Sequence, residues 1–165
     1  MSNLVVEIIE TNQAAADVMS GSGIAADSRP GVQFHEHLHL WVWRPRGILN
    51  EAMIDDIIEC IKAKEDKVGK PFNRFTDLSV IDAIDLHFKY VFHVALHRRL
   101  SYLDHLPLKS AFYVTSPATA HYVKIYALVC DHSPLRVEMF KERTAAATWL
   151  DVPIGFIDQS REGNA

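Results

Sequence analysis

Hydrophobic and polar residues alternate with a period of two in four segments of the chain, residues 34–43, 72–80, 108–115 and 135–140. This period predicts β-strands, because successive side chains of a strand point to opposite faces of its sheet. The first segment is rich in aromatic and branched residues, which favour strands, and it ends at Pro45. The pattern therefore predicts four core strands.

Between and after these segments the apolar positions repeat at helical spacing. Helices are predicted over residues 50–67, 82–103, 116–132 and 142–150. Asn50 and Asp82 are suited to the N-cap position, and Ser116 followed by Pro117 is a typical helix start. Each predicted strand is thus followed by a helix.

The predicted order is β-α-β-α-β-α-β-α over residues 34–150. Such alternation indicates an α/β fold, with a largely parallel sheet of about four to five strands and about four helices. Residues 1–33 are expected to form an N-terminal arm and a flexible connector rich in Ala, Ser, Gly, Asp and Pro. Residues 151–165 are expected to form a loosely held C-terminal tail.

The composition is that of one ordinary globular domain of 165 residues, 48% hydrophobic and 23% charged. A net charge of -4 gives no field that would attract nucleic acid. No apolar run is long enough to span a membrane, and the N-terminus lacks the basic region of a signal peptide. We therefore expect a cytoplasmic protein in which Cys60 and Cys130 are buried, reduced thiols.

Three segments resemble the SpoIIAA-like branch of the STAS fold. They are Gly47-Ile48-Leu49, Asp77-Leu78-Ser79 and the closing R-V-E-M-F-x-E-x-x-A-A-A-x-W-L, residues 136–150. The resemblance covers about residues 34–150. It implies a small sheet with helices, a cytoplasmic and often self-associating protein, and a role in binding partners without turning over a substrate.

Anti-sigma-factor antagonists with this fold are regulated by phosphorylation of a serine after the second strand. In this chain Ala83 and Ile84 occupy the two serine positions of that motif, so the usual phosphorylation does not transfer. Ser79 is the hydroxyl group close to this position, and it is our candidate for a modification or contact there. Related branches of the fold bind small anions or lipids, which stays open for this chain.

Four polar residues, Asp77, Ser79, Asp82 and Asp85, lie where the second predicted strand delivers its carboxyl end to a helix. Ligands of open α/β sheets bind beyond the carboxyl ends of strands, so these are our candidate ligand-binding or regulatory residues. The alternative is helix capping by Asp82 beside a solvated turn. Without a nearby base, metal motif or glycine loop, the group predicts no catalytic residues.

His35, Glu36 and His39 match the H-E-x-x-H pattern of zinc proteases. Those enzymes place both histidines on one face of a helix, whereas the period of two predicts a strand here. Residues four apart on a strand are separated by about 13 Å, too far for one metal ion. We therefore predict no metal and no cofactor, although neighbouring pairs among His35, His37 and His39 stay candidates for a metal site.

The predicted interface consists of His35, His37, His39, Trp41 and Trp43, which share one face of the first predicted strand. No predicted helix obviously covers this face, and uncovered apolar surface usually marks an interface. We expect these residues, or the N-terminal arm, to form the contact of a homodimer. Clustered histidines would make such a contact responsive to pH.

Aromatic residues on and near the long predicted helix suggest a different site. Phe88, Tyr90, Phe92 and Tyr113 could line a space for a lipid or other apolar molecule between the sheet and this helix, or form plain core.

A small basic patch follows on the same predicted helix. Arg98 and Arg99, with His97 and His105, could meet an anion or be ordinary surface.

The sequence thus predicts a non-catalytic binding or regulatory module that acts through protein contacts and self-association. The alternative is a carrier of a small ligand or lipid, so the expected partner is a protein or a small apolar or anionic molecule. A metal-dependent enzyme using His35, His37 and His39 is the third hypothesis.

Overall fold

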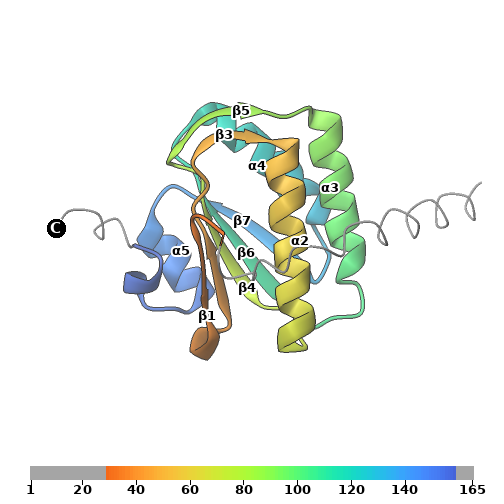
Figure 1. The fold of residues 1–165 in the computed structure, drawn as a ribbon, viewed down its shortest axis with the longest axis vertical. Coiled ribbons are helices and arrows are strands. Elements are labelled where there is room, and N and C mark those ends of the chain that lie inside the picture. Colours follow the sequence, from red (N-terminus) through yellow and green to blue (C-terminus); the bar gives the residue numbers. More distant parts are fainter. Residues whose placement is uncertain (1–28, 159–165) are drawn as a thin grey trace, which may run out of the picture.

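The computed structural model describes residues 29–158, which form two sheets and four α-helices (Figure 1). The strands are β1 Val32–His35, β2 Leu40–Trp43, β3 Gly47–Asn50, β4 Asn73–Asp77, β5 Ile81–Asp85, β6 Leu108–Tyr113 and β7 Leu135–Phe140. The α-helices are α2 Glu51–Val68, α3 Phe88–Ser101, α4 Pro117–Cys130 and α5 Arg143–Leu150. Two short 3-10 helices are η2 Glu36–Leu38 and η3 Ile154–Phe156.

The main sheet has five strands in the order β1-β2-β4-β6-β7. All neighbouring pairs are parallel except β1 and β2, which form an antiparallel pair. A second, two-stranded sheet pairs β3 with β5 in parallel. The predicted α/β class is confirmed, with a mostly parallel sheet.

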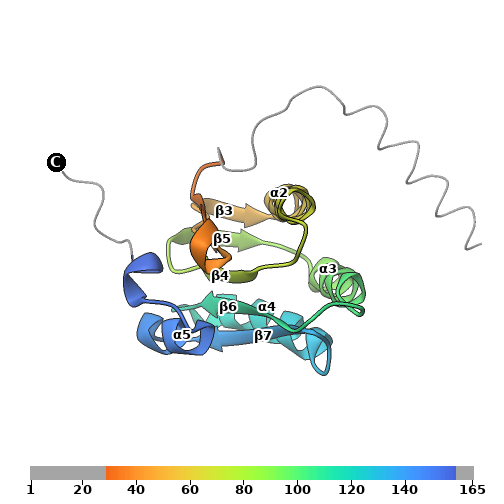
Figure 2. The ribbon, with the colours of Figure 1, turned by 90° about the horizontal axis from the view of Figure 1, so that it is seen from below.

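The helices cover the two faces of the main sheet unequally. Strands β2, β4, β6 and β7 follow one another across the sheet in one direction, so right-handed crossovers place α2, α3 and α4 on one face. The other face is covered by α5 and the segment around η3, which pack on Leu40, Val42 and Phe75. Figures 1 and 2 show α5 on one side of the sheet and α2 and α3 on the other.

Local signals explain where two of the helices begin. The side chain of Asn50 accepts a hydrogen bond of 3.0 Å from the backbone N–H of Met53, so the predicted N-cap of α2 is confirmed. Helix α4 begins at Pro117 directly after Ser116, as predicted. Helix α2 ends at Val68, and the C-cap residue Gly69 has a φ of 80°, in the left-handed region that favours glycine.

The prediction of one continuous strand over residues 34–43 is wrong. The segment is an antiparallel hairpin, in which η2 and a left-handed His39 (φ 47°) connect β1 to β2. His35, His37 and His39 therefore belong to a strand end, a 3-10 helix and a turn, and they do not share a face with the tryptophans. Alternation alone could not reveal the reversal, because no Gly or Pro marks it.

The predicted helix start at Asp82 is also wrong. Residues Ile81–Asp85 form β5, and α3 begins only at Phe88. Ile81 and Ile84 have the spacing of a helical stripe, but in the structure both pack on the cluster around Leu49. Pairing with β3 decides the conformation of this segment.

The domain extends beyond the predicted boundary at residue 150. Residues 151–158 are packed rather than loosely held, because the Ile157 side chain is fully buried and its carbonyl accepts a hydrogen bond of 3.0 Å from Arg44. At the other end, β1 begins at Val32, inside the predicted connector. The remainder of the predicted arm and tail, residues 1–28 and 159–165, lies outside the described residues.

Candidate ligand-binding site

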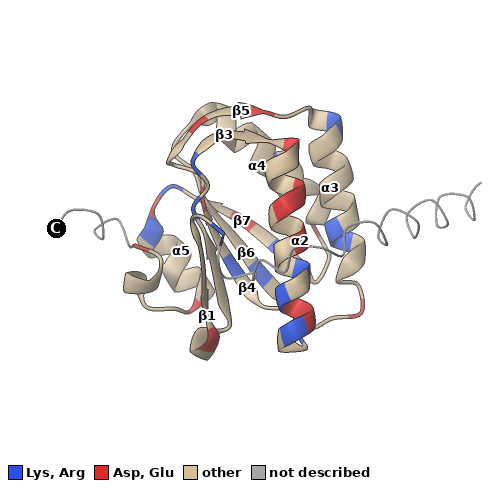
Figure 3. Cartoon of the chain, in the orientation of Figure 1, with Lys and Arg blue, Asp and Glu red and all other residues tan. Residues whose placement is uncertain are grey.

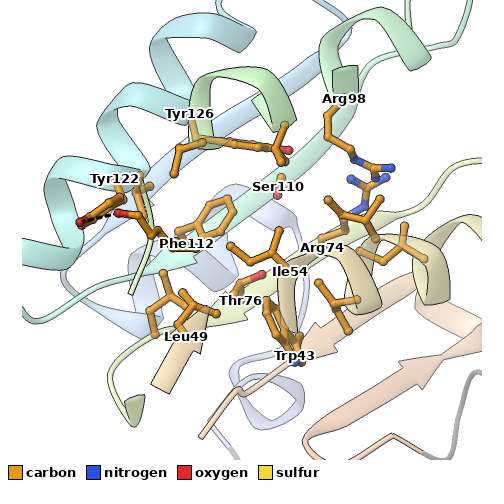
Figure 4. Close-up of a pocket in the computed structure, with 18 of the residues that line it drawn as sticks. Trp43, Leu49, Ile54, Arg74, Thr76, Arg98, Ser110, Phe112, Tyr122 and Tyr126 are labelled. Carbon is orange, nitrogen blue, oxygen red and sulfur yellow. Dashed lines mark hydrogen bonds between the residues drawn. The ribbon is translucent and has the colours of Figure 1, made fainter. Parts of the chain in front are cut away.

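A cavity of about 120 Å³ lies between the main sheet and helices α2, α3 and α4 (Figure 4); we call it the inner cavity. Its wall is mainly aliphatic and aromatic. The apolar lining includes Leu49, Ile54, Ile57, Ile58, Ile61, Val91, Val94, Phe112 and Val123. On this measure a single water needs about 10–15 Å³, so the space exceeds an ordinary packing gap.

The alternation along the strands explains which side chains reach the inner cavity. Arg74 and Thr76 of β4 line it, while Phe75 between them packs on the opposite face of the sheet. In β6, Ser110 and Phe112 alternate in the same way with Ala111. The isoleucine stripe of α2 supplies the facing wall, so the helical pattern in the sequence forms part of this site.

Two arginines end the apolar lining at one side. In Figure 4, Arg74 and Arg98 lie next to each other, away from Leu49 and Tyr122. Both residues are only 4% exposed. Burying a guanidinium group is costly unless it is paired, so the contacts of these two side chains decide what the site can bind.

Glu65, Arg74, Arg98 and Tyr102 form a group that we call the buried ionic cluster. Arg74 donates hydrogen bonds of 2.6 Å to the carboxylate of Glu65 and to the hydroxyl of Tyr102. Arg98 donates to the same hydroxyl at 2.5 Å. The Tyr102 hydroxyl in turn donates to both carboxylate oxygens of Glu65, at 3.0 and 2.9 Å. The cluster holds two guanidinium groups and one carboxylate.

Tyrosines and a cysteine near the cluster are held in their protonated forms. Burial raises the pKa of Tyr102, and the nearby Glu65 adds to this effect. Burial likewise raises the pKa of Tyr126 to about 12 and that of the Cys130 thiol to about 11. At neutral pH these groups therefore carry no negative charge that could balance the arginines.

A second, more polar cavity of about 430 Å³ lies between the C-terminal parts of α2 and α3 and the segments that follow them; we call it the outer cavity. The basic, acidic and histidine residues of its lining are Lys62, Glu65, Asp66, Lys70, His97, Arg98 and His105. Figure 3 shows Lys and Arg along these parts of α2 and α3. Ile58 and Arg98 line both cavities.

Of the four polar residues predicted as ligand-binding or regulatory candidates, the structure brings only Asp77 and Ser79 together. Asp77 is buried on the α5 face of the sheet and accepts hydrogen bonds from the Ser79 backbone and hydroxyl, at 2.9 and 2.6 Å. It also accepts a bond of 2.8 Å from Arg143 of α5. Asp82 and Asp85 lie exposed on β5, so they take no part in this arrangement.

The predicted interface residues are placed differently from the expectation. Trp41 is 1% exposed, because α2 covers it and its ring stacks on Phe72. Trp43 is half-buried and lines the inner cavity. The expectation of an uncovered tryptophan face is therefore wrong.

The histidines of the hairpin meet the C-terminal segment. The rings of His35 and His37 lie 5.0 and 5.3 Å from that of Phe156, so η3 packs against both. Burial, then His37 and Arg44, lower the pKa of His35. His39 is exposed in the turn. Across residues 29–158 no group of three or more His, Cys, Asp or Glu side chains is arranged to hold a metal ion.

The aromatic residues predicted for a carrier site are mostly elsewhere. Tyr90 lines the inner cavity, but Phe88 and Phe92 are exposed on α3. Tyr113 lies on the α5 face, where the Arg143 guanidinium stacks on its ring at 4.3 Å. The predicted space between sheet and helix therefore exists, with a lining that is largely aliphatic.

The sequence pattern does not single out Glu65, Arg74 and Tyr102. A signal was present for Arg74, since strands of a parallel sheet are covered on both faces and a charged residue inside such a strand is buried. The basic patch around Arg98 was noted, but Arg98 itself is buried in the cluster and Arg99 bonds to the Val129 carbonyl.

No helix among the described residues has the length and apolar character needed to cross a membrane.

The chain is similar in structure to an uncharacterized protein of the DUF3478 family, with a SpoIIAA-like fold, from Shewanella loihica PV-4. The two share 12% sequence identity with a TM-score of 0.49, over 73% of this chain and 90% of the other. No protein-family model and no curated protein matches the chain.

Proposed function

We propose that the chain is a non-catalytic binding module that holds the apolar part of a small molecule in the inner cavity. The observation that carries this proposal is the cavity of about 120 Å³ with a mainly apolar wall between the sheet and three helices. Protein interiors leave few voids larger than a water molecule, and those that stay empty are apolar and accept apolar guests. An apolar cavity of about 150 Å³ holds one benzene, so the buried part is about the size of a ring or short acyl chain.

The chemistry around the cavity favours binding over catalysis. The raised pKa values of Tyr102 and Tyr126 keep both hydroxyls protonated at neutral pH, so neither is a ready general base. The raised pKa of Cys130 keeps its thiol from acting as a nucleophile. The arginines can orient an anion but do not transfer protons at this pH. A cytoplasmic location is part of the same proposal.

Binding of 1-octanol, followed through the methyl NMR signals of the protein, tests the proposal. We expect saturable shifts for methyl groups of the lining, among them those of Ile57 and Val123. The variant Ile54→Phe fills the cavity and should weaken binding by about tenfold or more, since the guest loses its apolar contacts. Ile154→Phe makes the same change at an exposed position of η3 and should bind like the wild type. Equal binding to both variants would contradict the proposal.

Self-association is a second candidate function, favoured by a different observation. Phe88, Phe92, Leu96 and Leu100 follow one another at intervals of four along α3 and are 39% to 56% exposed. Exposed apolar stripes of this kind usually mark interfaces. Two copies related by a two-fold axis would pack the stripe against itself in antiparallel orientation, with the phenylalanines of one copy beside the leucines of the other.

The molecular mass in solution tests this second candidate. Light scattering coupled to size-exclusion chromatography should give a dimer for the wild type and a monomer for Phe92→Ser/Leu100→Ser. A substitution at an exposed leucine of α4, Leu128→Ser, is the control and should leave the dimer intact. A monomeric wild type would exclude this role for the stripe.

A further inference from the structure

The inner and outer cavities are neighbours that share two wall residues, Ile58 and Arg98. The inner wall is largely apolar, whereas the outer wall carries lysines, histidines and acidic residues. A molecule with an apolar chain and a charged end would therefore find a matching surface for each part, with Arg98 at the junction.

The sign of the charge follows from the buried ionic cluster. Arg74 and Arg98 contribute two positive charges, and Glu65 contributes one negative charge. The Tyr102 hydroxyl is already saturated, because it donates to Glu65 and accepts from both arginines. One positive charge is thus left over in a region where each arginine is 4% exposed. A bound anion would balance this charge.

Arg74 also carries an unused donor. Its Nε atom is buried and has no hydrogen-bond partner within the described residues. Arg74 lines the inner cavity, and buried donors are rarely left without a partner. This is a second sign that the buried ionic cluster lacks an acceptor.

The wall of the outer cavity also carries more positive than negative groups, as the buried ionic cluster does. Lys62, Lys70 and Arg98 oppose Glu65 and Asp66, and His97 and His105 add positive charge when protonated. An anion entering through the outer cavity therefore meets a wall with more positive than negative groups.

Resting on the proposed function, we infer that the ligand is an amphiphile with one carboxylate, whose apolar chain fills the inner cavity and whose carboxylate binds Arg98 beside Arg74. A single carboxylate matches the single unbalanced charge of the cluster. Its planar pair of oxygens suits the guanidinium group, which can donate two parallel hydrogen bonds.

Calorimetric titration with octanoate and with 1-octanol at neutral pH tests this inference. The two probes have the same chain length and differ in the charged end. We expect the wild type to bind octanoate at least about tenfold more tightly, because charge-assisted hydrogen bonds to buried groups are among the stronger ones. Arg98→Gln should lower the affinity for octanoate to about that for 1-octanol, while Arg136→Gln, at an exposed position of β7, should keep the preference for octanoate.

Because Arg98 is buried and the substitution can unfold the protein, a second variant is needed. Lys62→Gln/Lys70→Gln changes only the outer wall and should weaken octanoate binding about threefold without affecting octanol. Equal affinities of the wild type for both probes would overturn the inference and leave the proposed function standing. Octanoate binding that is unchanged in the lysine variant and in a folded Arg98→Gln would also overturn it. If neither probe binds, the proposed function itself fails.

Discussion

Arg143 of α5 donates a hydrogen bond of 2.8 Å to the carboxylate of Asp77, which lies 66 positions earlier at the end of β4. The other carboxylate oxygen of Asp77 accepts from the backbone and the hydroxyl of Ser79. The side chain of Asp77 is 3% exposed and that of Arg143 is 25% exposed. This bond fixes the start of α5 at the carboxyl edge of the main sheet.

Asp77→Ala should lower the free energy of unfolding by about 2 kcal/mol, because it removes the partner of Arg143 and the acceptor of the Ser79 turn. The partial exposure of Arg143 keeps the loss below that of a fully buried pair. Urea denaturation measures the change. Asp82→Ala, at an exposed position of β5, should cost much less. A similar loss in both variants would contradict the structural role of the pair.

Gly31→Ala should destabilise the protein by more than about 1 kcal/mol. Gly31 has a φ of 76°, and an added Cβ would lie 2.3 Å from the backbone carbonyl oxygen of Arg44. The strand pair β1–β2 would have to separate, since Arg44 also donates its N–H to the Gly31 carbonyl. Gly155→Ala meets no atom within 4 Å and is the matched control. Thermal unfolding of the two variants should differ clearly.

Stability should fall at alkaline pH. The folded-state pKa values of Cys130 and Tyr126, about 11 and about 12, lie above their ordinary values of 9.0 and 10.0. The stabilisation of the folded state by these two protonated groups is therefore complete below about pH 9, and it is lost as the pH rises through the folded-state pKa values. Urea midpoints at about pH 8 and about pH 10.5 should show the loss.

The variant Cys130→Ala tests whether the raised pKa of Cys130 causes part of the alkaline loss of stability. The variant should lose less stability over the same pH interval, because one group with a raised pKa is gone. An unchanged pH dependence would assign the loss to other groups.

Mild acid should also destabilise the protein through His35. Its pKa is lowered, chiefly by burial and then by His37 and Arg44, so the folded state favours the neutral ring. The stabilising contribution is present above the unfolded-state pKa of 6.5 and is lost as the pH falls through the lower folded-state value. His35→Gln should weaken this dependence, measured by thermal unfolding from about pH 7.5 to about pH 5.5. His132→Gln, at an exposed position, should leave it as in the wild type.

Local patterns predicted the elements whose conformation is decided locally. Strands β6 and β7 alternate over six residues each, and both were predicted close to their observed bounds. The N-cap at Asn50 and the Ser116-Pro117 start of α4 depend on neighbouring atoms, so they too could be predicted. The order of elements then led to the parallel sheet.

The elements that were missed depend on contacts between distant residues. Ile81 and Ile84 belong to a strand because β3 pairs with that segment, and their spacing alone favours a helix. The turn between β1 and β2 has a left-handed backbone conformation at His39, and no glycine in the sequence marks it. The site was missed for the same reason, because Glu65, Arg74 and Tyr102 come from three elements and gain a shared role only when these pack together.

The sequential order of the parallel strands has a consequence for the growing chain during translation. Each of β4, β6 and β7 pairs with the strand of the main sheet that was synthesised before it, so the main sheet can be extended in the order of synthesis. Helices α2, α3 and α4 cover their face as the sheet grows. The opposite face, with Leu40, Val42 and Phe75, stays open until α5 and residues 151–158 have left the ribosome. Residues 151–158, which are made after every strand of the main sheet, therefore complete the hydrophobic core on this face, and a ribosome that stalls before them leaves this apolar face exposed to chaperones.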